Sequence, residues 1–207
     1  MPVSKLMTPR SDIVTLSLTA PPTAILETVK ENFARLFSRR ALRKLMDSFV
    51  KVSDPQRAEA NRRILDEFIP EKVPVDLLQT VLRLLLEEKV SIRNLPLILE
   101  AIAESRSQLG APEAIAEHVR QRLGFQIVAE MLEEDGALPL IQLSPEWEET
   151  FSAHELKDGE GAGDVALPPS EFNRLAAAVA DKVAKAGADG RYPAIVTSTR
   201  RRRFLRT

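Results

Sequence analysis

Residues 75–105 read VDLLQTVLRLLLEEKVSIRNLPLILEAIAES and contain two apolar helical segments joined by a short polar hinge. The first segment places apolar residues at the i, i+3, i+4 and i+7 spacing of one helix face, at Leu78, Val81, Leu82 and Leu85. The second segment repeats this spacing, at Leu95, Ile98, Leu99 and Ile102. The pattern predicts a helical hairpin whose apolar faces need further helices to cover them.

The hinge between these segments is marked by charge and by helix signals. Glu87, Glu88 and Lys89 are predicted to end the first helix in solvent, and the next three residues alternate like a short extended piece. Asn94 belongs to the residue types that cap helix N-termini. Pro96 falls in the first turn of the second helix, where its missing N–H costs nothing. The sequence therefore predicts two separate helices.

Further helices are predicted on both sides of this region. Before it, helical spacing begins at residue 24, Ser38 is a candidate cap, and Asp54 followed by Pro55 is a typical helix start. The polar face of that last helix, residues 56–63, is interpreted as solvated surface. After the central region, apolar spacing up to Leu132 predicts one long helix, which Asp135 and Gly136 end. Gly124 lies inside this helix at a cost of roughly 1 kcal/mol against alanine, which indicates close packing by a neighbouring backbone.

The composition changes after Gly136. Short apolar runs at residues 138–143 and 193–198 predict two strands, and helices are predicted to start near Ser144, Pro168 and Thr199. Residues 157–164, KDGEGAGD, are interpreted as a flexible acidic loop. The expected fold is therefore mainly α with a small α/β C-terminal part: a helical bundle subdomain over residues 24–136, followed by a small sheet-and-helix subdomain over residues 137–207. Residues 1–23 are expected to form a poorly ordered arm, with at most a weak strand at residues 12–19.

The composition limits the classes of function. Of the 207 residues, 44% are apolar and 29% are charged, as in ordinary globular proteins. The 29 Lys and Arg residues balance 30 Asp and Glu residues, so the whole chain has no electrostatic preference for nucleic acid or anionic lipid. The absence of cysteine excludes disulfides and thiolate chemistry. No apolar run approaches the roughly 18–20 residues that span a bilayer, so no part of this sequence is predicted to cross a membrane.

Candidate catalytic and metal-binding groups are sparse. His118 and His154 are the two histidines, and their separation does not match a metal-binding spacing. No nucleophile stands in a sequence frame that would place a base beside it. The acidic residues 87–88 and 133–135 lie at predicted helix ends and are interpreted as solvated. The glycines of residues 157–164 do not connect a strand to a helix as a phosphate loop does. We therefore predict no catalytic, cofactor-binding or metal-binding residue, and a non-enzymatic function.

The sharpest charge feature is the arginine run near the C-terminus, with Arg200, Arg201, Arg202 and Arg203 predicted to form a basic surface. Such a run can neutralise phosphates and bind nucleic acid without sequence preference. The run lacks an aromatic stacking platform, and it also resembles the first turn of a helix that packs Phe204 and Leu205 inward. An anionic protein surface is the favoured partner, and a nucleic-acid-binding adaptor is the alternative.

The run LLLEEKVSIRNLPLILEAIAE within residues 75–105, followed by EHVRQRLGFQI at residues 117–127, resembles the cytoplasmic domain of the flagellar and virulence type III export-gate family, FHIPEP. The resemblance extends from about residue 24 to the C-terminus and does not include residues 1–23. It implies a ring of subunits on the cytoplasmic side of the bacterial inner membrane, in which a full-length member is embedded through a multi-span part while this sequence itself is soluble.

The same resemblance implies a function. The ring would be a docking platform for export substrates, their chaperones and the connecting parts of the ATPase complex, with no small-molecule or nucleic-acid partner. Ring or partner contacts are predicted at the charged hinge and on the long helix that follows residue 113, at Glu87, Glu88, Arg93 and Arg120. Family members continue beyond the helix that starts near Arg200 and add a further strand. Residues 137–207 are therefore expected to have an unpaired sheet edge and to be the least stable part of the molecule.

Overall fold

The computed structural model describes residues 32–129, 131–156 and 165–206. The chain divides into two compact units between Ile127 and Val128, whereas the sequence placed the boundary near Gly136. We call the described part of the first unit the helical unit and that of the second the α/β unit. The predictions for the arm at residues 1–23, for residues 24–31 and for the acidic loop at residues 157–164 lie outside the described residues.

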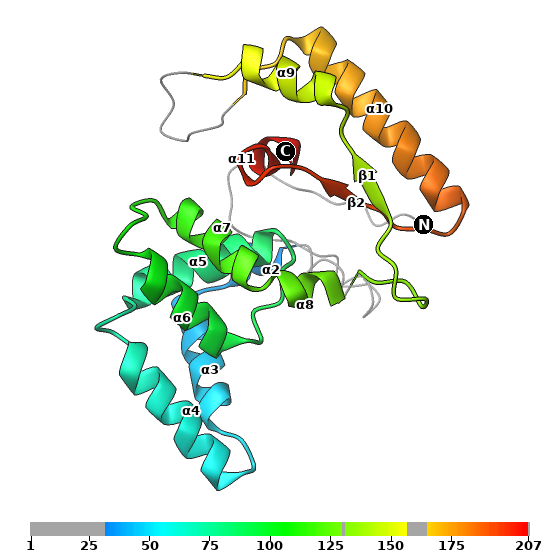
Figure 1. The fold of residues 1–207 in the computed structure, drawn as a ribbon. Coiled ribbons are helices and arrows are strands. Elements are labelled where there is room, and N and C mark those ends of the chain that lie inside the picture. The colour runs from blue at the N-terminus through cyan, green and yellow to red at the C-terminus, as the bar shows by residue number, and fades with distance from the viewer. Residues whose placement is uncertain (1–31, 130, 157–164, 207) are drawn as a thin grey trace, which may run out of the picture. The chain divides into compact units, whose positions relative to one another are not determined.

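Seven helices are described up to the end of the helical unit, the last of which crosses the division (Figure 1). They are α2 (Phe33–Leu36), α3 (Arg39–Val50), α4 (Pro55–Phe68), α5 (Val75–Glu87), α6 (Leu95–Ser105), α7 (Pro112–Arg122) and α8 (Gly124–Ala129). Two of the predicted caps are formed. The Ser38 Oγ accepts from the Ala41 N–H at 3.3 Å, and the Asp54 carboxylate accepts from the Gln56 N–H at 3.0 Å. Asn94 takes the N-cap position of α6, but its side chain makes no capping hydrogen bond.

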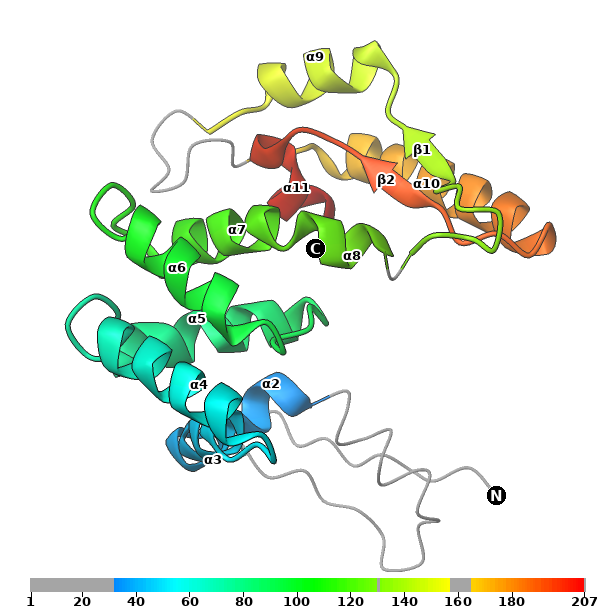
Figure 2. The same cartoon turned by 60° about the horizontal axis from the view of Figure 1, so that its bottom comes forward.

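The core of the helical unit contains the apolar stripes predicted from residues 75–105. Each stripe residue of α5 and α6 is at most 1% exposed. The expected hairpin needs correction, however, because the close helix pairs are α5 with α7 and α6 with α7, so the third helix packs against both. It contributes Ile115 and Val119 to the core, and Leu123 follows directly after it. Figure 2 shows these helices from a second side, with α3 and α4 forming their own pair.

The structure also changes two predictions about helix surfaces. The long helix expected up to Leu132 is broken at Leu123, and no atom lies within 4 Å of a Cβ built at Gly124, so the predicted close backbone packing at this glycine is wrong. The polar face of α4 is largely exposed, but Asn61 is buried. Its side-chain amide is satisfied there, because Nδ2 donates to the Phe49 carbonyl at 2.6 Å. This bond holds the start of the α3–α4 connection.

The hinge after α5 is closed by a Schellman motif. Lys89 has φ +59°, in the left-handed region that glycine usually occupies at this position. The Val90 N–H donates to the Leu85 carbonyl at 2.9 Å, and the Lys89 N–H donates to the Leu86 carbonyl at 3.0 Å. Val90 and Leu85 are both buried, which is the apolar contact that accompanies this motif. The turn is therefore fixed by packing although its central residue is lysine.

Replacing Lys89 with glycine is expected to stabilise the helical unit by about 0.5–1 kcal/mol. A left-handed conformation costs an L-residue roughly 1–2 kcal/mol, and glycine offsets part of this gain through its larger unfolded-state entropy. Urea unfolding followed by far-UV circular dichroism measures the change. Lys89→Ala retains the β-carbon and should leave the midpoint nearly unchanged. A lower midpoint for Lys89→Gly would contradict the assignment.

The α/β unit contains β1 (Leu140–Gln142), α9 (Pro145–Ala153), α10 (Pro169–Ala188), β2 (Ala194–Val196) and α11 (Thr199–Arg206). The two strands pair in parallel, with Leu140 opposite Ala194 and Gln142 opposite Val196. Since α9 and α10 lie between the strands in sequence, they form the crossover that a parallel pair requires (Figure 1). The predicted fold class, mainly α with a small α/β C-terminal part, is confirmed.

The described helices are also informative about membrane insertion. None of the helices within the described ranges is both long and apolar enough to span a bilayer.

Candidate interaction surfaces

The predicted contact residues at the hinge divide into two kinds. Arg120 Nε on α7 lies 3.2 Å from Glu88 Oε2, and the two side chains are 28% and 18% exposed. This pair ties the end of α5 to α7. Glu87 and Arg93 instead lie exposed on either side of the hinge. The structure therefore uses two of the predicted residues to hold the hinge in place and presents the other two on the surface.

The arginine run does not form the continuous basic surface that the sequence predicted, because Arg201 is only 1% exposed. Its Nε donates to Glu148 Oε1 at 3.1 Å, and its Nη2 donates to Glu155 Oε2 at 3.2 Å and to the Ser152 Oγ at 3.3 Å. The guanidinium carbon also lies 5.9 Å from the centroid of the Phe151 ring. Arg201 therefore joins α11 to α9 inside the α/β unit.

The neighbouring arginines differ from Arg201. Arg200 is exposed and forms an ion pair with Glu155. Arg202 is half-buried, and the side chain of Arg203 lies outside the described residues. The positive charge of the run is thus partly neutralised within the protein, which removes the main basis of the nucleic-acid alternative.

The position of Arg201 follows from residues on α9 and directly after it. Glu148 and Ser152 lie one turn apart on α9, and Glu155 lies two residues after the end of the helix; together they form the polar row that Arg201 contacts. Beside this row, Phe151 is fully buried and meets the Phe204 ring of α11 edge-on at 5.6 Å. The polar residues and the aromatic residue beside them are visible in the sequence. Nothing in the sequence indicates that they contact Arg201, which lies about fifty residues later.

The short sheet of the α/β unit leaves apolar side chains exposed. Leu140, Ile195 and Val196 are 58%, 37% and 44% exposed, although all three belong to strands. Each strand has three residues, and the described residues include no third strand beside them. Two-stranded sheets of this size have little independent stability in water.

Hydrogen exchange should therefore separate the two units. The amides of residues 195–197 are expected to exchange at least roughly tenfold faster than those of residues 82–86, because weakly packed elements open locally at low free-energy cost. Proteolysis should likewise begin in the α/β unit. Equal protection of these two sets of amides would show that the sheet is stabilised by a contact that the described residues do not include.

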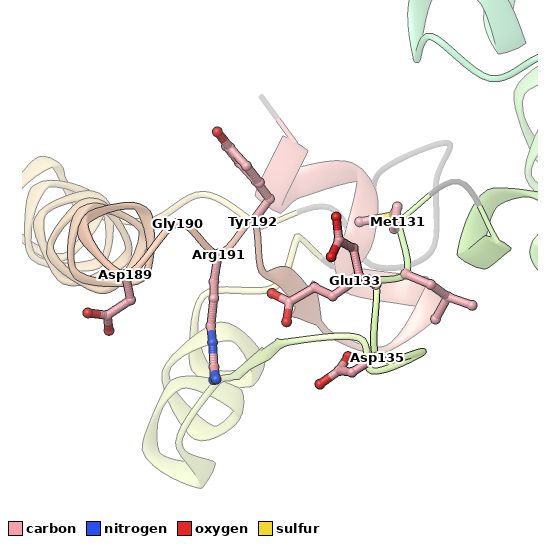
Figure 3. Close-up of a pocket in the computed structure, with 9 residues that line it drawn as sticks. Met131, Glu133, Asp135, Asp189, Gly190, Arg191 and Tyr192 are labelled. Atoms are coloured by element: carbon pink, nitrogen blue, oxygen red, sulfur yellow. The ribbon is translucent and has the colours of Figure 1, made fainter.

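A pocket of about 740 Å³ opens at the start of both strands (Figure 3). Its walls are two backbone segments, residues 131–135 before β1 and residues 189–192 before β2. The Arg191 and Tyr192 side chains leave the second segment in opposite directions. The sequence had interpreted residues 133–135 as a solvated helix end, and did not indicate that residues 189–192 lie beside them.

The two histidines lie in different units, and each has its own neighbours. His118 Nε2, in the helical unit, lies 3.6 Å from Glu104 Oε2, and His154 Nδ1, in the α/β unit, lies 2.9 Å from the Thr150 carbonyl. Within the described parts of the chain, no three His, Asp or Glu side chains are grouped so that they could hold a metal ion.

Comparison with known proteins gives a continuous family match. The model of the FHIPEP family matches residues 13–207. The match begins eleven residues before the point at which the sequence resemblance was placed, so the prediction that residues 1–23 lie wholly outside the family is wrong. The described fold begins at residue 32, well inside this match.

Individual relatives agree with this match. The flagellar biosynthesis protein FlhA of Caulobacter vibrioides is 34% identical over 185 residues, which are 89% of this chain and 25% of that protein. Among solved structures, nonameric SctV-C of EPEC has a TM-score of 0.70 at 18% identity, covering 88% of this chain and 52% of that one. The structure of the Chlamydia pneumoniae CdsV and CdsO complex gives 0.62 at 20% identity, covering 89% and 51%. The chain thus spans about a quarter of the length of its FlhA relative.

Proposed function

The chain belongs to the FHIPEP family, and from this membership we propose that it is a component of a bacterial type III protein export gate. Its proposed role is that of a docking platform, at the cytoplasmic side of the inner membrane, for export substrates, their chaperones and parts of the ATPase complex. The observation that carries the proposal is the unbroken family match over residues 13–207, which includes both units.

The solved relatives support this proposal at the level of the fold. One similar fold assembles as a nonamer, that of SctV-C, and another occurs in the structure of a complex between CdsV and CdsO. We propose that this chain likewise meets further copies of itself in a ring and a second protein of the export apparatus. We propose a non-enzymatic role, because the proposal rests on membership of a family of export-gate components.

The ring contact is proposed to use the hinge of the helical unit. Glu87 and Arg93 have opposite charges and lie exposed on the two sides of the hinge. A neighbouring copy can therefore meet them with complementary charges, which sets orientation more than affinity. The Glu88–Arg120 pair would keep the hinge in the shape that this contact needs.

The isolated chain is expected to be a monomer, or to self-associate weakly, at micromolar concentration. Exposed ion pairs contribute only about 0.2–1 kcal/mol each, and the proposed contact presents few of them. Light scattering after size exclusion should give a mass near 23.0 kDa. A stable ring under these conditions would show that a larger, apolar contact drives assembly.

A graft tests the proposed function directly. Residues 13–207 would replace the matching segment of the Caulobacter vibrioides FlhA, and swimming motility and flagellin secretion would be measured. We expect partial secretion from the graft. The matched control carries Arg201→Ala, which should lower secretion together with the stability of the α/β unit. A graft that is present at normal levels in the membrane but secretes nothing would count against the export-gate role.

A further inference from the structure

We propose that the pocket between residues 131–135 and residues 189–192 docks a cationic segment of a partner protein, through a lysine or arginine side chain carried on an apolar helix or strand. The proposal rests on the docking role proposed above and names the chemistry of one partner. It concerns the α/β unit alone.

The two walls of the pocket are fixed by backbone hydrogen bonds. In the first wall, the Glu133 N–H donates to the Ala137 carbonyl at 2.9 Å and the Gly136 N–H donates to the Glu133 carbonyl at 2.9 Å. In the second, the Arg191 N–H donates to the Ala186 carbonyl at 2.9 Å, which closes the end of α10. Gly136 and Gly190 supply the positive φ values of 79° and 73° that these turns require. The pocket is therefore largely preformed.

The charge of the pocket is strongly one-sided. Four acidic residues and one basic residue line it: the acidic residues are Glu133, Glu134, Asp135 and Asp189, and the basic residue is Arg191. This excess of negative charge accelerates the approach of a cationic partner and disfavours an anionic one. The carboxylates do not converge closely enough to hold a bare metal ion, so the charge is matched better by a cation on a side chain.

The apolar side chains that line the pocket also favour a basic residue of a partner protein as the ligand. Tyr192 is 83% exposed, and Met131 and Leu132 are 38% and 44% exposed. Tyr and Met are enriched at protein interfaces. The aliphatic stem of lysine or arginine lies favourably along such apolar groups while its charged end stays near carboxylates, and the Tyr192 ring offers a face for a cation. A basic residue next to apolar residues would therefore match both the acidic and the apolar residues that line the pocket.

The single tyrosine of the chain makes the test specific. The full chain is labelled with 3-fluorotyrosine, so that one fluorine resonance reports on Tyr192. The probe is a synthetic helical peptide of lysine and leucine, and its binding is also followed by the anisotropy of a dye on the peptide. We expect a saturable change of the fluorine resonance and weaker binding as salt rises, because exposed charges are screened. A peptide with glutamate in place of lysine should not bind.

A pair of matched variants locates the site. Glu134→Gln with Asp189→Asn removes two exposed pocket carboxylates, and Glu146→Gln with Glu149→Gln removes two exposed carboxylates of α9 outside the pocket. The pocket variant is expected to bind the lysine peptide at least about fivefold more weakly, and the α9 variant within about twofold of the parent. Asp135 is left unchanged because its Oδ1 accepts from the Ala137 N–H at 2.8 Å.

Each contrary outcome is decisive. Equal binding by both variants, binding without a change at Tyr192, equal binding of the glutamate peptide, or no binding at about millimolar peptide would overturn the pocket assignment. None of these results affects the export-gate proposal, which the graft tests separately.

Discussion

Arg201→Ala is expected to destabilise the α/β unit by about 2–4 kcal/mol. Removing one partner of a buried ion pair usually costs roughly 3–5 kcal/mol, because the remaining charge stays buried without compensation. Here the cost is somewhat lower, since the Glu148 side chain is 55% exposed and can regain water, whereas that of Glu155 is only 19% exposed. The substitution also leaves a cavity beside Phe151, whose ring is completely buried.

Trp147 provides a reporter for this prediction because it is the only tryptophan of the chain. It lies in α9, with its ring 6.1 Å from that of Phe151 and 4.6 Å from the guanidinium carbon of Arg174. Urea unfolding followed by tryptophan fluorescence therefore measures the α/β unit, while far-UV circular dichroism is dominated by the longer set of helices in the helical unit. The Arg201→Ala midpoint should fall by fluorescence.

Two further variants separate geometry from charge. Arg201→Lys retains the positive charge but loses the planar fork that reaches Glu148 and Glu155 together, so it should recover only part of the lost stability. Arg200→Ala removes an exposed arginine from the same run and should cost at most about 1 kcal/mol. If the alanine variants of Arg200 and Arg201 unfold at the same urea concentration, the structural role assigned to Arg201 is incorrect.

The contrast between Arg200 and Arg201 shows which features could not be predicted from the sequence. Helix periodicity and caps are local, so the apolar stripes of α5 and α6 and the caps at Ser38 and Asp54 were predicted correctly from the residues alone. Burial of Arg201 depends instead on a polar row, on α9 and directly after it, that lies far away in sequence. Four consecutive arginines are identical in the sequence, and the fold determines which of them faces inward.

Local exceptions were missed for a different reason. Lys89 adopts the conformation expected of glycine, so the Schellman motif that closes the hinge has no signal in the sequence. The break at Leu123 was hidden because the apolar spacing continues through it into α8. The candidate pocket could not be anticipated, since its two walls become neighbours only through the parallel pairing of β1 with β2. Each miss reflects tertiary packing that overrides local preference.

Leu82→Ala and Leu99→Ala are each expected to destabilise the helical unit by about 2–5 kcal/mol. Both side chains are 0% exposed and belong to one core cluster, on α5 and α6 respectively. Alanine and leucine are both good helix formers, so the substitutions change the intrinsic helix propensity little. The loss of stability comes instead from the lost transfer free energy of the leucine side chain and from the cavity that remains. Since whole domains are stable by only about 5–15 kcal/mol, either change removes a large fraction of the total.

The measurement is urea unfolding followed by far-UV circular dichroism, in which the midpoint should fall by roughly 1 M or more. Leu36→Ala is the matched control, because Leu36 lies on α2 of the same unit and is 45% exposed; its cost should stay below about 1 kcal/mol. Because α7 packs against both α5 and α6, the two cavities open toward a shared helix, and the double variant need not lose the sum of the two single costs. A parental midpoint for either single variant would mean that the apolar stripes of residues 75–105 do not form the core, and the helical unit would then have to be organised around other contacts.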